Sequence, residues 1–155
     1  MKGFIGEDFL LTTEAARRLY HEHAEKMPIF DYHCHLNPAE IYENKQFSDI
    51  GEAWLAGDHY KWRVMRANAV PEEYVTGSAS FRDKFNRFAE VMPGLIGNPI
   101  YHWSHLELKR FFGIDELLSS KTADMVWETA NAKLQSPAGA ARALIQESNV
   151  RALCT

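Results

Sequence analysis

Apolar side chains recur at helical spacing along most of this chain. Between residues 12 and 26 they return every three or four positions, after Thr12 and Thr13, which are typical helix caps. The expected apolar stripe of this helix comprises Ala16, Leu19, Tyr20, His23 and Ala24. Further helices are predicted at about residues 39–44, 48–56, 59–69, 71–75, 80–92, 99–112, 121–134 and 137–147. Pro99 favours a helix start and Gly113 a helix end, so the chain is predicted to be mostly helical.

Two short runs of β-forming residues interrupt this helical pattern. Residues 29–34 and 149–154 are each of strand length, and the first is expected to be buried. Strands joined through helices pair in parallel, and the helix at about 137–147 is the expected crossover. The segment between the strands is far longer than a crossover needs, so most of it is predicted to be a helical insertion.

These patterns predict an α/β chain in three parts. Residues 1–37 would hold the N-terminal helix and first strand, 38–134 the helical insertion subdomain, and 135–155 the crossover helix and second strand. A two-stranded parallel sheet is not stable alone and exposes unpaired edges, so other strands are expected to flank it. We therefore expect the chain to be a truncated part of a larger fold.

Composition and charge narrow the classes of function. Hydrophobic residues make up 46% of the 155 positions, which suits an ordinary globular domain. The net charge of −4 gives no basic footprint for phosphate backbones, so nucleic acid is not an expected partner. No apolar run approaches the roughly 20 residues of a membrane span, and the first residues do not resemble a signal peptide. Cys34 and Cys154 are expected to be free, buried thiols in a cytoplasmic protein.

His33 and His35 stand at the end of the first predicted strand. Alternate strand residues point to one face about 6.6 Å apart, so both rings can reach a single ion. The carboxyl end of a parallel strand is also where α/β folds place their sites. Alternatively, both rings hydrogen-bond to backbone or carboxylate groups in a core. Because two polar rings beside an apolar strand need partners, the pattern favours a divalent metal, for which zinc is the first candidate.

A dense group of anion- and hydroxyl-binding side chains occupies residues 58–66, which read Asp58-His59-Tyr60-Lys61-Trp62-Arg63-Val64-Met65-Arg66. The residue types suit a substrate-binding segment, and they equally suit a helix with a solvated basic face and a buried aromatic one. His102 and His105 lie three apart on a predicted helix, beside aromatic neighbours. We expect this second pair to serve packing and hydrogen bonding rather than metal binding.

Three motifs together resemble one enzyme family. They are Asp31-Tyr32-His33-Cys34-His35-Leu36, then Gly57-Asp58-His59-Tyr60-Lys61-Trp62-Arg63, then Gly97-Asn98-Pro99-Ile100-Tyr101-His102-Trp103-Ser104-His105-Leu106-Glu107-Leu108. In this combination and order the chain resembles uronate (glucuronate) isomerase, of the amidohydrolase superfamily. The likeness covers the whole chain, and the second and third motifs are far more specific than two histidines alone.

The resemblance implies a fold, a reaction and a set of site residues. The fold is a metal-dependent (β/α)8 TIM barrel, of which this chain would hold the first two strands. The reaction interconverts D-glucuronate with D-fructuronate, and D-galacturonate with D-tagaturonate. His33 and His35 match the metal ligands of the family's first strand, while His59 and Tyr60 match catalytic and substrate-binding positions, with Arg63 a weaker candidate. The family's other metal ligands and most of its carboxylate-binding arginines fall beyond Thr155, so the chain alone is expected to be inactive.

Two other functions remain open at this point. A metal-dependent hydrolase could use the same barrel to attack an amide or ester. The chain could also be a non-catalytic helical module that carries a vestigial strand. On the isomerase interpretation the partner is a uronic acid sugar, with no nucleic acid and no membrane, and the enzyme is expected to form a homo-oligomer.

Overall fold

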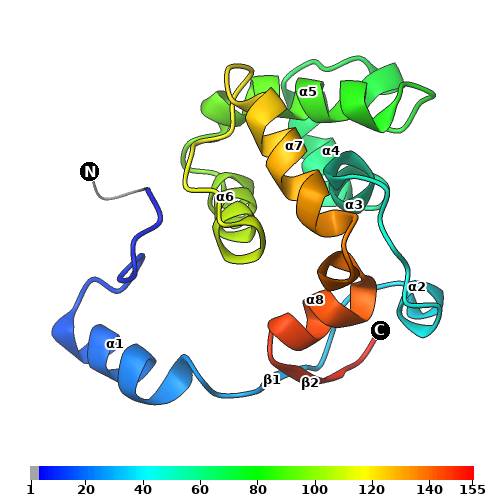
Figure 1. Cartoon of the computed structure of the whole chain (residues 1–155). Helices are drawn as coiled ribbons and strands as arrows, with labels where there is room; N and C mark the ends of the chain where they lie inside the picture. The colour runs from blue at the N-terminus through cyan, green and yellow to red at the C-terminus, as the bar shows by residue number, and fades with distance from the viewer. Residues whose placement is uncertain (1–3) are drawn as a thin grey trace.

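The computed structural model describes residues 4–155 as a mostly helical chain with one small sheet (Figure 1). Its α-helices are α1 (Glu14–Leu19), α2 (Pro38–Tyr42), α3 (Ile50–Leu55), α4 (His59–Ala67), α5 (Phe81–Val91), α6 (Pro99–Phe112), α7 (Ala123–Leu134) and α8 (Ala141–Glu147). A π-helical turn, Tyr20–Ala24, continues α1, and 3-10 turns lie at Glu72–Tyr74, Met92–Leu95 and Pro137–Gly139. The strands are β1 (Ile29–Asp31) and β2 (Val150–Leu153). The predicted order of helices and strands is confirmed.

Short polar side chains fix where several helices begin. The Thr13 hydroxyl accepts a hydrogen bond from the Ala16 amide at 3.1 Å, and the Asn98 side chain accepts one from the Ile100 amide at 2.9 Å. Such caps satisfy amides that have no partner within the helix. At the other end of α6, Gly113 takes the left-handed conformation with φ of 67°. These local signals explain why the predicted bounds of α6 agree with the structure.

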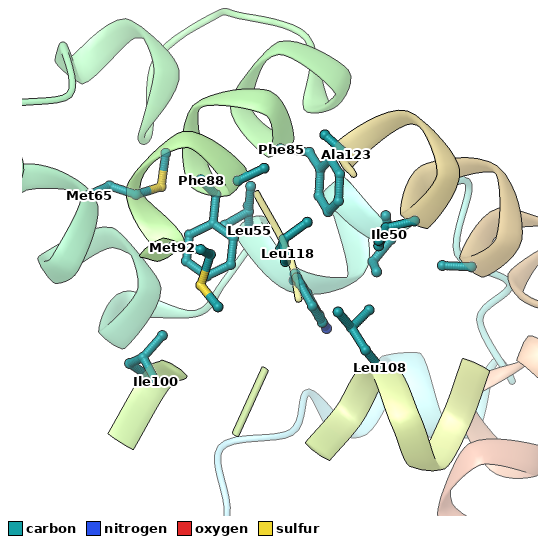
Figure 2. Close-up of a cluster of buried hydrophobic side chains, with 14 of the residues drawn as sticks. Ile50, Leu55, Met65, Phe85, Phe88, Met92, Ile100, Leu108, Leu118 and Ala123 are labelled. Atoms are coloured by element: carbon teal, nitrogen blue, oxygen red, sulfur yellow. The ribbon is translucent and has the colours of Figure 1, made fainter. Parts of the chain in front are cut away.

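One hydrophobic core joins α3, α4, α5, α6 and α7. Phe85 and Phe88 of α5 are fully buried, and the Trp54 ring meets the Phe88 ring edge-on at a centroid distance of 5.9 Å. Figure 2 shows further side chains converging on the same cluster, among them Ile50, Leu55, Met92, Leu108 and Leu118. The cluster runs from Ile50 to Leu134, so its members lie in the predicted helical insertion. The division of the chain into three structural parts stays a prediction.

The N-terminal helix stands apart from this core. Figure 1 shows α1 away from α3 to α7, and none of its residues is buried. Leu19, which we placed on its apolar stripe, is 63% exposed, and His23 is exposed as well. The predicted helix is confirmed, but Leu19, His23 and Ala24 of its apolar stripe are exposed, because periodicity shows which side chains share a face and not what covers that face. No helix among residues 4–155 is long and apolar enough to cross a membrane.

The two strands pair in parallel, as predicted. Ile29 lies opposite Val150 and Asp31 opposite Leu153, with an irregularity of register between Ile29 and Phe30. The expectation that the first strand is buried is wrong, since Phe30 is 68% exposed. Within residues 4–155 the sheet has no third strand, so little apolar surface is available to cover it. Cys34 and Cys154 are free, as expected, but the expectation that they are buried is wrong: Cys34 is half-buried and Cys154 is exposed.

Hydrogen bonds tie α8 and the end of α7 to α2 and the loop after it. The Arg142 guanidinium donates to the Ile41 carbonyl at 2.8 Å and to the Tyr42 carbonyl, both at the end of α2. The Gln46 side chain donates to the carbonyls of Leu134 and Ser136. These bonds hold residues 41–46 against α7 and α8. The neighbouring Glu40, Lys45 and Phe47 line, with Asp31 at the end of β1, a pocket described below.

Candidate functional site

The first predicted metal ligands lie just after β1. The chain leaves the strand at Asp31, whose side chain accepts a hydrogen bond from the His33 amide at 3.3 Å. The Cys34 amide donates to the Cys154 carbonyl at 2.9 Å, which extends the pairing with β2 past the end of the strand. Backbone contacts therefore hold the His33–His35 segment at the carboxyl end of β1.

The two imidazole rings face each other. His33 Nε2 and His35 Nε2 lie 3.1 Å apart, and the ring centroids are 5.0 Å apart at an interplanar angle of 83°. Two imidazole nitrogens at this separation can both contact one ion at the zinc–nitrogen distance of about 2.0–2.1 Å. The donor type and spacing thus fit a divalent metal. Among residues 4–155 no group of three or more His, Cys, Asp or Glu side chains could hold an ion, and two histidines are fewer than the three protein ligands typical of a catalytic zinc site.

The N-terminus of α4 brings the second motif to the same place. Asp58 caps this helix, because its Oδ1 accepts hydrogen bonds from the amides of Tyr60 and Lys61 at 2.9 and 3.1 Å. The rings of His59 and Tyr60 stack at a centroid distance of 4.6 Å, and the His35 and His59 centroids lie 6.1 Å apart. Segments that are separate in the sequence therefore place three histidines and a tyrosine in one neighbourhood.

An open pocket of about 850 Å³ unites these residues. Of the five predicted site residues, His33, His35, His59 and Tyr60 line it. Arg63 does not line the pocket. It is exposed one turn along α4, with its guanidinium 5.5 Å from the centre of the Tyr60 ring. The structure thus brings the metal candidates and the main substrate-binding candidates together, with Arg63 immediately behind them.

Acidic side chains that sequence analysis missed form much of the pocket wall. The lining includes the carboxylates of Asp31, Glu40, Glu52 and Asp58, against the single ammonium of Lys45. Lys45 Nζ lies 2.8 Å from Glu40 and 3.0 Å from Glu52. The hydrogen bond to Glu40 raises the pKa of Lys45 despite its partial burial, so this lysine stays charged. No periodicity marks these residues, and only the packing of β1, α2, α3 and the start of α4 around one pocket brings them together.

The other histidine pair lies elsewhere, as expected. His105 is buried in α6 with both ring nitrogens engaged: Nδ1 lies 2.7 Å from the Tyr101 carbonyl, and Nε2 accepts from the Leu118 amide at 2.9 Å. Neither nitrogen is free for a metal. The interpretation of His105 as a packing and hydrogen-bonding residue is confirmed.

The sequence and the fold both match known proteins. The sequence model of the glucuronate isomerase family matches residues 1–155. Uronate isomerases from Marinomonas sp. and Caldicellulosiruptor saccharolyticus are each 57% identical to this chain over 156 and 155 residues, which is all of this chain and 33% of each relative. The chain thus spans about a third of the length of the curated relatives it matches.

Two solved structures share the fold. The uronate isomerase of Thermotoga maritima superposes with a TM-score of 0.92 at 45% identity, over 98% of this chain and 33% of that protein. The glucuronate isomerase of Caulobacter crescentus superposes with a TM-score of 0.79 at 26% identity, over 84% of this chain and 29% of that protein. Because the family model matches residues 1–155, the chain belongs to the glucuronate isomerase family.

Proposed function

We propose that this chain is the N-terminal third of a uronate isomerase built on a metal-dependent (β/α)8 barrel. In this proposal β1 and β2 are the first two barrel strands. The enzyme interconverts D-glucuronate with D-fructuronate, and D-galacturonate with D-tagaturonate. Family membership does not favour the hydrolase or the non-catalytic module.

One observation carries the proposal: His33, His35, His59 and Tyr60 line a single pocket at the carboxyl end of β1. These four residues come from two motifs more than twenty positions apart. In (β/α)8 enzymes the catalytic groups gather at the carboxyl ends of the strands. The pocket therefore lies where an isomerase site of this kind is expected and carries part of the side chains that such a site would use.

The reaction moves a proton between C1 and C2 while the carbonyl group moves between the same two carbons. His33 and His35 would hold the divalent metal, with zinc as the first candidate, and a bound cation supplies an electrophile for the sugar oxygens. The Tyr60 hydroxyl donates a hydrogen bond to a substrate hydroxyl, and His59 orients the sugar beside it. Protein groups placed in this way stabilise charge on the oxygens as the enediol forms.

The charges of the pocket orient a sugar acid. Carboxylates dominate the wall, so they accept hydrogen bonds from sugar hydroxyls and repel the substrate carboxylate. On α4, Lys61 pairs with Asp58 and Arg66 pairs with Glu72, whereas Arg63 forms no ion pair within the described part of the chain. Arg63 is thus the cation of α4 available to the substrate carboxylate, together with groups from the rest of the barrel.

A chimera tests this proposal. This chain would replace the matching third of the Marinomonas sp. uronate isomerase, whose identity of 57% favours correct packing of the two parts. We expect the chimera to isomerise D-glucuronate and D-galacturonate and to bind one zinc at the His33–His35 site. His33→Ala and His35→Ala should each remove both the metal and the activity, measured by atomic absorption and by formation of the ketose.

Simple esters and amides provide the control substrates. Hydrolysis of these without uronate turnover would replace the isomerase proposal with the hydrolase. A well-folded chimera that turns over neither class would overturn both. The 155-residue chain alone should bind zinc weakly and show no activity, because two histidines fall short of the three or more protein ligands of a catalytic zinc site. We further propose that the full enzyme is a cytoplasmic homo-oligomer.

A further inference from the structure

Lys61 is a buried cation directly beneath the candidate site. It follows His59 and Tyr60 on α4, yet only 4% of its surface is exposed and it does not line the pocket. Lysine is almost never buried to this extent unless its ammonium is paired. The partners of Lys61 therefore show what the buried charge does.

Two carboxylates and one aromatic ring surround the Lys61 ammonium. Nζ donates to Asp58 Oδ2 at 2.7 Å, lies 3.9 Å from Glu107 Oε2, and stands 5.1 Å from the centre of the Trp54 ring. The other Asp58 oxygen, Oδ1, caps α4 through the amides of Tyr60 and Lys61. Lys61 thus fixes the position of the Asp58 carboxylate, and this carboxylate caps the first turn of α4.

The ion pair also keeps Asp58 charged. Partial burial by itself raises the pKa of Asp58, but the Lys61 charge and the hydrogen bonds from Lys61 and Tyr60 outweigh this effect and leave the pKa lowered. An ionised cap accepts hydrogen bonds more strongly than a neutral one and also interacts favourably with the helix dipole. The direction of the pKa agrees with the geometry of the cap.

Glu107 connects this arrangement to the third motif of the sequence. It lies on α6, in the segment from Gly97 to Leu108 to which the proposed mechanism assigns no role. Within residues 4–155, Glu107 is the carboxylate that reaches Lys61 from another helix, and the Trp54 ring of α3 also lies beside the ammonium. Through Glu107, α6 fixes the position of α4 relative to the core, and therefore the position of His59 and Tyr60 relative to β1.

We propose that Lys61, clamped between Asp58 and Glu107, is a positioning residue that sets the orientation of His59 and Tyr60 toward the substrate. This inference rests on the proposed function, because it assigns Tyr60 and His59 to the sugar. A displacement of about 1 Å at a catalytic group can lower turnover by about a hundredfold. Loss of the clamp therefore changes kcat although Lys61 touches no substrate.

Lys84 supplies a matched control. It is also a buried lysine of the helical core, with 7% of its surface exposed, and its Nζ donates to the Gly77 carbonyl at 2.7 Å. It lines none of the candidate site. Lys84→Met removes a buried ammonium of the same kind without touching the clamp, so it reports the purely structural cost of such a substitution.

The test compares Lys61→Met and Lys84→Met in the chimera, alone and combined with Tyr60→Phe. We expect Lys61→Met to lower kcat by at least about tenfold with zinc content retained, and by less than about threefold in the Tyr60→Phe background, because coupled residues are not additive. Lys84→Met should leave kcat within about twofold in both backgrounds. Equal losses from Lys61→Met in the two backgrounds would show that it does not act through Tyr60 and would overturn the proposal.

Hydrogen exchange gives a readout that needs no activity. In Lys61→Met the backbone amides of residues 60 and 61 should exchange at least about tenfold faster than in the unsubstituted protein. Lys84→Met should leave the exchange rate of the Tyr60 amide unchanged. Unchanged protection at residue 60 in Lys61→Met would refute the clamp. Should Lys61→Met fail to fold, Glu107→Gln keeps the shape of α6 and removes one arm of the clamp, with the same coupling to Tyr60 expected. Absence of turnover in the unsubstituted chimera would count against the proposed function, and the exchange data would still decide the clamp.

Discussion

At Tyr60 the role of the hydroxyl can be tested separately from the packing of the ring. The ring stacks on His59 at 4.6 Å and lies 5.5 Å from the Arg63 guanidinium. Both contacts involve the aromatic face and survive loss of the hydroxyl. A change from tyrosine to phenylalanine at this position therefore removes the proposed hydrogen bond to the sugar and little else.

We expect Tyr60→Phe in the chimera to lower kcat by about a hundredfold, within the range that one positioned catalytic group contributes. KM should change little, because the ring packing that shapes the pocket stays. Steady-state kinetics on D-glucuronate measures both constants. Arg63→Met is the comparison, since loss of a carboxylate-binding cation should raise KM instead. Unchanged turnover in Tyr60→Phe would remove Tyr60 from the mechanism.

His105 is held in one neutral tautomer by two backbone groups. Its Nε2 accepts from the Leu118 amide, so the proton resides on Nδ1, which donates to the Tyr101 carbonyl. Burial lowers the pKa of His105, and neighbouring His102 lowers it further, against the opposing effect of the Tyr101 carbonyl. As the pH falls below the ordinary value of 6.5, the unfolded chain gains a proton that folded His105 does not. The stability that His105 contributes is therefore present above pH 6.5 and is lost as the pH falls toward its folded pKa.

His105→Phe should reduce the free energy of unfolding by about 1–3 kcal/mol at pH 8, because it leaves the buried Leu118 amide without an acceptor. The loss should shrink between pH 6.5 and 5, where the original histidine contributes less. Urea denaturation at several pH values measures the difference between the two proteins. This difference isolates His105 from His21, whose pKa is raised by its hydrogen bond to Asp8 and whose effect has the opposite sign. A loss that is constant across this pH range would contradict the lowered pKa of His105.

At the scale of elements, α3 and α5 approach closely because position 51 is a glycine. A Cβ atom at Gly51 would lie 2.5 Å from the Phe81 carbonyl oxygen, at the start of α5. Backbone atoms cannot move aside as a flexible side chain can. The contact places α3, and with it the site residue Glu52, against the core.

Gly51→Ala should therefore lower stability by about 1–3 kcal/mol, the usual cost of overpacking. Gly57→Ala is the control, because a Cβ there meets no atom within 4 Å. Thermal unfolding of the two variants of the chimera gives the comparison. Equal melting temperatures would mean that α3 and α5 can separate without cost.

Local signals made the positions of the helices and strands predictable, but they did not show which side chains other parts of the chain would bury. Caps such as Asn98 and the left-handed Gly113 act within one turn, so α6 could be bounded from the sequence. The run of β-forming residues placed the histidine pair near the end of the first strand, although that strand ends at Asp31 and not at residue 34 as predicted. The exposure of Leu19 and Phe30 depends on what packs over them, and the acidic wall with Glu40 and Glu52 depends on how α2 and α3 pack beside β1. Such long-range consequences carry no periodic signature in the sequence.

At the scale of the whole molecule, the hydrophobic core and the sheet beside the site are stabilised by different elements. The buried cluster from Ile50 to Leu134 draws its members from the helical part alone. The sheet has α8 beside β2, while Ile29 and Phe30 of β1 are exposed. In the proposed barrel, further strands and helices would cover this surface. In the 155-residue chain alone, α3 to α7 should therefore keep their structure even if the sheet does not.

The exposed sheet should make the 155-residue chain associate with itself. Phe30 and Tyr32 are 68% and 89% exposed, and the outer edges of β1 and β2 have no neighbouring strand within the described chain. We expect the sedimentation coefficient of the chain to rise with concentration. Phe30→Ser should weaken this association, whereas Ile96→Ser should not, because Ile96 is 76% exposed but lies in the loop before α6, away from the sheet. A monomer at every concentration would mean that the exposed sheet does not drive self-association. An equal effect of the two substitutions would mean that association uses scattered apolar side chains rather than the strands.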